Sequence, residues 1–312
     1  MNEVVWRDLE FGARVDGTPF RIRLAKVTGG RPGPTTAVVG GMWGDKPMGC
    51  LSVHELIEIV RSADDLSGSV VFAPAVNLPA LSVGRRYSPD GIQLNRRFPG
   101  RERGFLNDQI AHLLMEEVVG PADVVVDLHS GTPDMSLHYT YDFGCLELSA
   151  AFGRLPIVVG HTYPGQLCSA AAAADVPACL PEFGGGPSTS LTDGVEGVCN
   201  VLRWTGQLGG ELAGPRSLPV IDEVTLELVS THGILVSSVD PASTGDDIDA
   251  GVLGEVRSAV DGSVLERFEL DRDGILLMSR CTPIMVTPGD YAFMVGHPSD
   301  RIELPARGSF RS

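Results

Sequence analysis

Residues 35–61 read TTAVVGGMWGDKPMGCLSVHELIEIVR, a strand pattern followed directly by a helix pattern. The first five residues are apolar or β-branched, as in a buried strand, and two glycines end the run. From residue 47 onward apolar side chains recur at helical spacing, and a proline stands at the helix start, where proline is tolerated. We therefore expect Trp43 and Lys46, which lie between the two elements, on a loop at a strand end.

The same alternation continues to about residue 205. Apolar runs predict strands over residues 70–72, 124–128, 156–159 and 179–180, and helical spacing predicts helices over residues 105–119 and 188–205. Strands that alternate with helices favour an α/β layer with a largely parallel sheet. Functional side chains then belong on the loops at the strand ends.

Residues 209–218 are rich in Gly, Pro and Ser, and no helical periodicity returns after them. Six short strand patterns follow, over residues 224–229, 233–239, 254–260, 263–270, 275–279 and 291–295. We therefore place a boundary near residue 215. The prediction is an α/β domain with the active-site pocket over residues 1–215, and a β-rich domain over residues 216–312.

Charge limits the classes of partner. The 312 residues carry 24 Lys and Arg against 40 Asp and Glu, a net charge of −16, which disfavours nucleic acid and anionic membranes. No apolar run approaches the ~20 residues of a membrane span, and no signal peptide opens the chain, so we expect a cytoplasmic protein. The six cysteines are widely spaced, and we expect them to be reduced. Six arginines nevertheless cluster between residues 85 and 103, which suits a small anionic ligand.

Four stretches at expected strand ends concentrate polar residues: GMWGDKP (41–47), GRR…QLNRRFPG (84–100), DLHSG (127–131) and PEFG (181–184). In order and spacing they resemble the succinylglutamate desuccinylase/aspartoacylase family, relatives of the zinc carboxypeptidases, whose stretches read G-x-H-G-x-E-P, R…D-L-N-R-x-F-P-G, D-L-H and P-E-x-G. The resemblance covers nearly the whole chain. It implies a zinc-carboxypeptidase-like mixed, mostly parallel sheet flanked by helices, followed by a small all-β domain akin to a lipoyl-carrier barrel.

The resemblance also implies roles for individual residues. By motif, Glu182 is the general base, Arg86 stabilises the oxyanion, and Asn95 with Arg96 grips a substrate carboxylate. The family holds zinc with the His and Glu of its first stretch and the His of its third. Only the last of these ligands, His129, is present here.

Trp43 and Lys46 stand at the other two ligand positions. An indole cannot ligate zinc, an ammonium is repelled by it, and zinc normally needs three protein ligands. We therefore expect no metal and no other cofactor. Zinc would require ligands rewired around His129, for example with Asp45 and His138, and no spacing favours that set.

Lys46 offers a substitute for the missing metal. A zinc ion with one ligand carboxylate has a formal charge of +1, and a protonated lysine has the same. We hypothesise that Lys46 forms an ion pair with Glu182 and polarises a carbonyl, or acts as base or nucleophile. The competing interpretation is that Lys46 is a solvated surface lysine in a decayed site. Trp43 could stack on a substrate or on Arg86, or it could only fill the space that the metal has vacated. Asn95 and Arg96 could serve only to brace their loop.

Three functions remain open. The first is a metal-independent enzyme, derived from an N-acyl-amino-acid deacylase, that acts on a small carboxylate-bearing amide, imine or acyl-amino acid. The second is a pseudoenzyme that binds such a ligand, or a protein partner, without turnover. The third is a zinc deacylase with rewired ligands. The expected partner is a small anionic acyl-amino-acid-like substrate, and a homo-oligomer is compatible with the sequence.

Overall fold

The structure, a computed structural model, describes residues 1–161 and 163–310. The strands of the first two-thirds are β1 (Val4–Phe11), β2 (Phe20–Thr28), β3 (Arg31–Gly40), β4 (Ser67–Ala73), β5 (Val124–Ser130), β6 (Met135–Asp142), β7 (Ile157–Val158) and β8 (Ala178–Gly185). Those of the last third are β9 (Ser217–Leu228), β10 (Gly233–Ser237), β11 (Asp247–Ile248), β12 (Gly251–Arg257), β13 (Val264–Leu270), β14 (Gly274–Arg280), β15 (Ile284–Val286) and β16 (Tyr291–Glu303).

The α-helices are α1 (Met48–Ser62), α2 (Leu78–Leu81), α3 (Leu106–Leu114), α4 (Leu146–Phe152), α5 (Leu167–Ala173) and α6 (Thr192–Trp204). Three short turns complete the elements: η1 (Leu94–Arg96), η2 (Met115–Val119, a π-helical continuation of α3) and η3 (Pro241–Ser243). The helices that the sequence predicts over residues 47–61, 105–119 and 188–205 are therefore confirmed as α1, as α3 with η2, and as α6.

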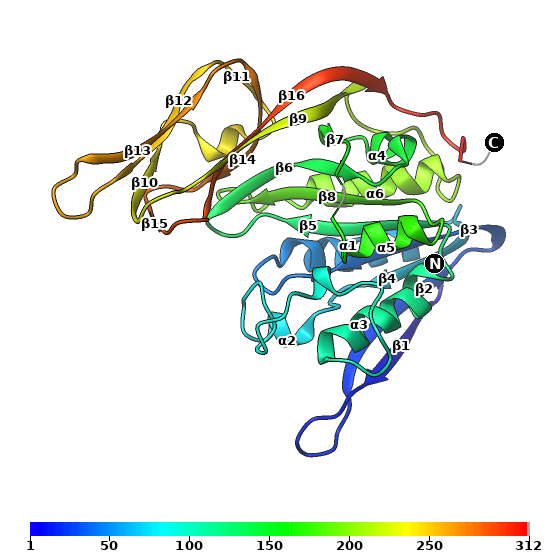
Figure 1. The fold of residues 1–312 in the computed structure, drawn as a ribbon. Coiled ribbons are helices and arrows are strands. Elements are labelled where there is room, and N and C mark those ends of the chain that lie inside the picture. Colours follow the sequence, from blue (N-terminus) through cyan, green and yellow to red (C-terminus); the bar gives the residue numbers. More distant parts are fainter. Residues whose placement is uncertain (162, 311–312) are drawn as a thin grey trace.

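A twelve-stranded mixed sheet runs through the molecule in the order β1-β2-β4-β3-β5-β8-β6-β7-β9-β16-β14-β11 (Figure 1). Its centre, β4-β3-β5-β8, is parallel, as the alternation of strands and helices predicts. Helices α1, α4 and α6 pack on one face of this centre, and α3 and α5 on the other. Because β3, β5 and β8 run in the same direction, their carboxyl ends meet at one edge, where the functional loops lie.

The start of α1 lies very close to this edge. A Cβ on Gly49 would stand 2.4 Å from the carbonyl oxygen of Leu128, so only glycine lets the first turn of α1 rest against β5. Gly41, with φ of +72°, turns the chain out of β3 just before. These two glycines fold the loop that carries Trp43 and Lys46 back over the end of β5.

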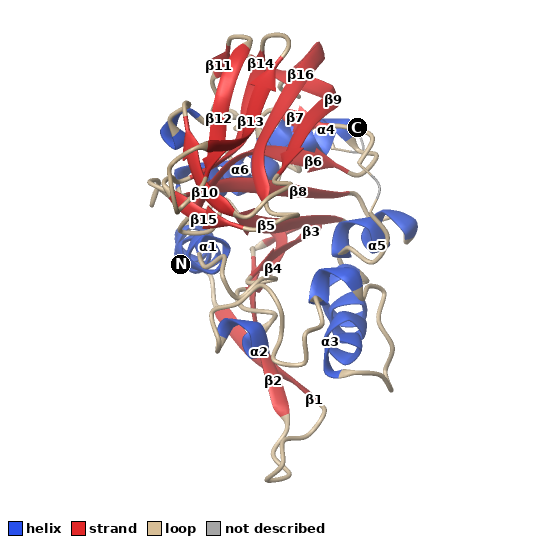
Figure 2. Cartoon of the chain, turned by 60° about the vertical axis from the view of Figure 1, so that its left-hand side comes forward, coloured by secondary structure: helices blue, strands red, loops and turns tan. Residues whose placement is uncertain are grey.

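The C-terminal third differs from the separate all-β domain that the sequence predicts. Strands β9, β14 and β16 belong to the large sheet, and β14 also pairs with β6, so that β6, β7, β9, β16 and β14 form a closed, barrel-like ring. Within the described residues a second sheet is formed by β13-β12-β10-β15, which lies at one end of the molecule in Figure 1 and comes forward in Figure 2. Short apolar runs predict strands but not which strands pair, so the sequence could not show that the C-terminal strands join the large sheet. The division at residue 215, just before β9, stays a prediction.

The local patterns also miss several elements. The β1–β2 hairpin, which pairs from Val4 with Val27 to Phe11 with Phe20, was not predicted, nor were β6, α4 and α5. Among the described residues, no helix combines the length and the apolar character that crossing a bilayer requires.

Candidate active site

The four motif stretches converge on one site. Trp43 and Lys46 follow β3, His129 lies near the end of β5, and Glu182 lies in β8, where it is the cross-strand partner of His129. Arg86 and Arg96 arrive on the long loop between α2 and α3. The convergence follows from the parallel centre of the sheet, whose strand ends share one edge.

Lys46 and Glu182 form a buried ion pair. Nζ of Lys46 lies 3.0 Å from Oε2 of Glu182, and the two side chains are 8% and 10% exposed. The interpretation of Lys46 as a solvated surface lysine is therefore wrong. Within the described residues this is the one hydrogen bond of Nζ, so its remaining N–H groups are available to a ligand in the adjoining cavity.

His129 is held from three sides. Its Nε2 lies 3.0 Å from Oδ2 of Asp127, and its Nδ1 accepts a hydrogen bond of 3.0 Å from the indole N–H of Trp43. Oε1 of Glu182 lies 3.4 Å from the same Nδ1. The indole N–H can point at Nδ1 only while that nitrogen carries no proton, so the proton of the neutral ring sits on Nε2, facing Asp127.

Opposite charges set the ionisation of this cluster. Burial by itself raises the pKa of Glu182, but Lys46 and His129 outweigh it and lower the pKa to about 2. Burial by itself lowers the pKa of His129, but Asp127 and Glu182 outweigh it and raise the pKa to about 9. A proton that reaches Nδ1 of His129 is therefore held well, and it then faces Glu182 instead of the indole.

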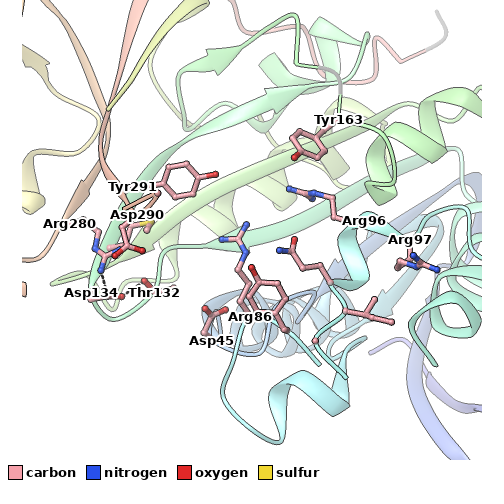
Figure 3. Close-up of a pocket in the computed structure, with 16 residues that line it drawn as sticks. Asp45, Arg86, Arg96, Arg97, Thr132, Asp134, Tyr163, Arg280, Asp290 and Tyr291 are labelled. Carbon is pink, nitrogen blue, oxygen red and sulfur yellow. Dashed lines mark hydrogen bonds and ion pairs between the residues drawn. The ribbon is translucent and has the colours of Figure 1, made fainter. Parts of the chain in front are cut away.

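Arg86 and Arg96 flank the indole of Trp43. Their guanidinium carbons lie 4.4 Å and 5.8 Å from its ring centroid, and Arg96 also lies 4.0 Å from the ring of Tyr163. Cation–π contacts of this kind fix an arginine without neutralising it. Neither guanidinium has an ion pair among the described residues, whereas Arg97 pairs with Asp108. Figure 3 shows Arg86 and Arg96 pointing into the same space and Arg97 turned away.

Asn95 combines a structural contact with an open donor. It is fully buried, and its Oδ1 accepts the backbone N–H of Leu167, which fixes the amide. Asn95 lines the inner cavity, and its buried Nδ2 has no hydrogen-bond partner in the described chain. An unpaired buried donor is costly, so this atom fits a ligand acceptor. Arg96 does brace the loop, because it donates to the carbonyl of Asn95 at 2.5 Å, but its stacking also leaves its charge in the cavity.

Two cavities meet at these arginines. The inner chamber, of about 350 Å³, contains Lys46, Glu182, His129 and Asn95. The outer chamber, of about 820 Å³, contains polar residues such as Asp45, Gln93 and Asp290 (Figure 3). Their shared walls are Arg86, Arg96, Met135, Tyr163 and Tyr291. The outer chamber therefore adjoins the inner one at these five residues.

Sequence reasoning missed several residues of the site. Asp127, two residues before His129, received no role although the D-L-H motif contains it. Tyr139 and Tyr141 lie on β6 and line the inner chamber, and Tyr141 stacks on His161 with ring centroids 3.8 Å apart. The alternation Met135, Leu137, Tyr139, Tyr141 is a period-2 pattern that could have indicated this strand.

Comparison with known proteins identifies the family. A family model, the succinylglutamate desuccinylase/aspartoacylase catalytic domain, matches residues 32–202. The N-alpha-acetyl-L-2,4-diaminobutyric acid deacetylase of Halomonas elongata is 32% identical over 281 residues, which cover 83% of this chain and 80% of the relative. This chain belongs to the succinylglutamate desuccinylase/aspartoacylase family. The membership that the four motifs indicate is therefore confirmed, and with it descent from enzymes that remove acyl groups.

Solved structures of the family share the fold. A succinylglutamate desuccinylase/aspartoacylase from Rhodobacter sphaeroides is 24% identical with a TM-score of 0.83, and the match covers 95% of this chain and 96% of that one. The product-bound ectoine utilization protein EutE (DoeB) of Ruegeria pomeroyi is also 24% identical, with a TM-score of 0.82 and 94% of each chain covered. At these identities the likeness shows the fold alone.

The residues of this chain do not fit the zinc ion that family resemblance implies. An indole N–H occupies the lone pair of Nδ1 on His129, the nitrogen that Asp127 would otherwise leave open to a metal. The ammonium of Lys46 stands at the second vacated position and is already paired with Glu182. Among the described residues, no group of three or more His, Cys, Asp or Glu side chains is placed to hold a metal.

The shifted pKa values predict how stability depends on pH. The pKa of Glu182 is lowered from 4.5 to about 2, so its contribution is present above pH 4.5 and is lost as the pH falls toward 2. The pKa of His129 is raised from 6.5 to about 9, so its contribution is full below pH 6.5 and is lost as the pH rises through 9. Between pH 5 and pH 2 the loss from Glu182 is about 3 kcal/mol.

Urea unfolding at a series of pH values measures this dependence. Glu182→Gln should flatten the acid side of the curve, and the exposed control Glu102→Gln should leave it as in the wild type. Equal acid sensitivity in all three proteins would contradict the assignment.

Proposed function

We propose that the chain is a metal-independent deacylase that cleaves the C–N bond of a small carboxylate-bearing acyl-amino acid, or of a related amide or imine. The observation that supports this most is the buried pair of Lys46 and Glu182 beside the inner chamber, in which Lys46 stands at the motif position of a zinc ligand. The pair supplies a fixed positive charge and a carboxylate at the same point. Membership of a deacylase family gives the reaction class.

The proposed roles follow the geometry. The free N–H groups of Lys46 and the guanidinium of Arg86 polarise the carbonyl and stabilise the oxyanion that forms when water adds. Asn95 Nδ2 and Arg96 bind the substrate carboxylate, because both residues line the chamber and Nδ2 has no other partner in the described chain. Glu182 accepts the proton of the attacking water, and protonated His129, whose pKa is raised to about 9, donates a proton to the leaving amine. The proton on Glu182 then passes to His129 and restores both groups. From an amide the products are a free carboxylate and an amine, and from an imine they are a carbonyl compound and an amine.

One observation favours a second function, ligand binding without turnover. Both oxygens of Glu182 have partners, Oε2 with Lys46 and Oε1 near His129, and a carboxylate whose pKa is about 2 is a weak base. A pseudoenzyme would keep the arginines and Asn95 and lose only the proton transfer. The two functions differ in whether the amide bond breaks.

Turnover measured without metal decides between them. N-acetyl-L-2,4-diaminobutyrate, N-succinyl-L-glutamate and N-acetyl-L-aspartate should be incubated with chelator-treated protein and the free amine measured by mass spectrometry. We expect release from at least one compound, unchanged by 1,10-phenanthroline, with a pH–rate profile that shows two titrating groups. Glu182→Gln should lower kcat at least about 100-fold and remove both pH limbs. Binding of these compounds without release would favour the pseudoenzyme, and activity that the chelator abolishes would overturn metal independence.

A further inference from the structure

The inner chamber has two unlike halves. In the polar half, His129, Glu182 and Tyr139 are successive cross-strand neighbours on β5, β8 and β6. The other half continues on the same large sheet, where Leu137 of β6 pairs with Met278 of β14, Met278 with Met294 of β16, and Met294 with Leu226 of β9. These four apolar side chains line the chamber; we call them the apolar row.

The apolar row is built by the closed ring of strands. Because β14 pairs with both β6 and β16, the C-terminal strands lie beside the polar half of the chamber. Leu137, Met278 and Met294 are 4%, 2% and 6% exposed, and Leu226, at the open end, is 46% exposed. The lysine and the arginines that line the chamber are Lys46, Arg86 and Arg96, and all three come from the first third of the chain. The row is therefore an apolar surface without a charge of its own.

We infer that the apolar row is a subsite for an apolar acyl group larger than acetyl, so that the substrate is a carboxylate-bearing amide with a branched aliphatic or aromatic acyl group. This inference rests on the proposed amide substrate. Methionine side chains adapt their shape to aromatic and aliphatic groups, and a chamber of about 350 Å³ has room for more than an acetyl group. A second carboxylate, as in a succinyl group, would lose its water against the row without gaining a partner there.

The orientation of the ligand follows from the two halves. With the acyl group against the row, the carbonyl lies toward Lys46, and the substrate carboxylate lies toward Asn95 and Arg96. Each methylene transferred from water to the row should tighten binding about fourfold, up to the length of the row. The acyl group, rather than the carboxylate, then determines which substrate is selected.

A series of N-acylglycines tests the inference with the full chain. Affinities of N-acetyl-, N-butanoyl-, N-benzoyl- and N-succinylglycine should be measured by calorimetry, and the same samples analysed by mass spectrometry for cleavage. We expect benzoyl to bind at least tenfold more tightly than acetyl, and butanoyl more tightly than succinyl, which has the same number of carbons. Where cleavage occurs, kcat/KM should follow the same order.

Two leucines of one strand provide a matched pair of variants. Leu226 and Leu228 lie on β9 and are both 46% exposed, but Leu228 lines neither chamber. Leu226→Gln should weaken benzoylglycine binding at least threefold and leave acetylglycine unchanged, and Leu228→Gln should match the wild type. Met294→Gln gives a second test inside the row.

The outcomes separate this inference from the proposed function. Binding that strengthens with acyl size but leads to no cleavage supports the subsite and counts against the deacylase. Cleavage without dependence on acyl size, succinyl binding that exceeds butanoyl binding, or no binding of any of the four compounds at millimolar concentration overturns the subsite.

Discussion

Replacing Lys46 by methionine is expected to lower the free energy of unfolding by about 3–5 kcal/mol, because it leaves the carboxylate of Glu182 buried without its ion-pair partner. Methionine has nearly the length and volume of lysine, so the loss reflects charge rather than a cavity. His129 compensates only in part, because its Nδ1 lies 3.4 Å from Oε1 of Glu182, whereas Nζ of Lys46 lies 3.0 Å from Oε2. Glu182 in the variant will therefore take up a proton at a higher pH than in the wild type.

The chain supplies its own control for this experiment. It contains two lysines, and the second, Lys26, is exposed on β2. Urea unfolding at pH 7 should show a large loss for Lys46→Met and a change within about 0.5 kcal/mol for Lys26→Met. The double variant Lys46→Met/Glu182→Gln should recover much of the loss, because no charge is then left unpaired. Equal stability of the two lysine variants would mean that Lys46 and Glu182 do not form a buried pair in solution.

The stability deficit of Lys46→Met relative to the wild type should become smaller in acid. In the wild type, acid removes the contribution of Glu182, whose pKa is lowered. In Lys46→Met, protonation relieves the unpaired charge, so the difference between variant and wild type should shrink as the pH falls from 7 to 4. A difference that stays constant over this range would contradict the electrostatic cause.

The polar half of the site was predictable from the sequence, since its residues sit at the ends of strands that are visible as local patterns. Trp43, Lys46, His129 and Glu182 each follow or end an apolar run, and parallel strands necessarily bring such ends together. The ion pair between Lys46 and Glu182 was expected from their charges together with the family resemblance, which puts Lys46 at a zinc-ligand position and makes Glu182 the general base. The structure adds its distance and its burial.

The apolar half was not predictable in the same way. Leu137 and Met278 are cross-strand neighbours although 141 positions separate them, and no local periodicity contains such a pairing. The role of Trp43 also needed coordinates, because whether an indole N–H reaches Nδ1 of His129 or only fills space depends on differences of about 1 Å. Residue types and spacing thus indicate which polar groups meet at the site. The pairing of distant strands builds the apolar row, and the direction of the indole N–H decides the role of Trp43, and neither can be read from local sequence.

Exchanging two residues should create a zinc site in this chain. In the double variant Trp43→His/Lys46→Glu, the indole no longer occupies Nδ1 of His129, and the ammonium is replaced by a carboxylate. Asp127 keeps the proton of His129 on Nε2, as in the wild type, so Nδ1 faces the new ligands with its lone pair free. Three protein ligands with an open fourth position are the usual zinc set of a catalytic site.

Zinc content measured by elemental mass spectrometry, after dialysis against micromolar zinc, tests this exchange. We expect about one zinc per chain in the double variant and affinity at least about 1,000-fold above that of the wild type, because loss of even an outer partner of a ligand weakens a zinc site 10–100-fold. Each single variant, Trp43→His or Lys46→Glu, retains the other blocking side chain and should bind zinc weakly. Adding His129→Phe to the double variant should abolish zinc binding. One dialysis-resistant zinc per wild-type chain would show that the chain holds metal through other ligands, and the proposed role of Lys46 would then fail together with metal independence. A metal-free wild type beside a metal-binding double variant would instead assign the loss of zinc to Trp43 and Lys46.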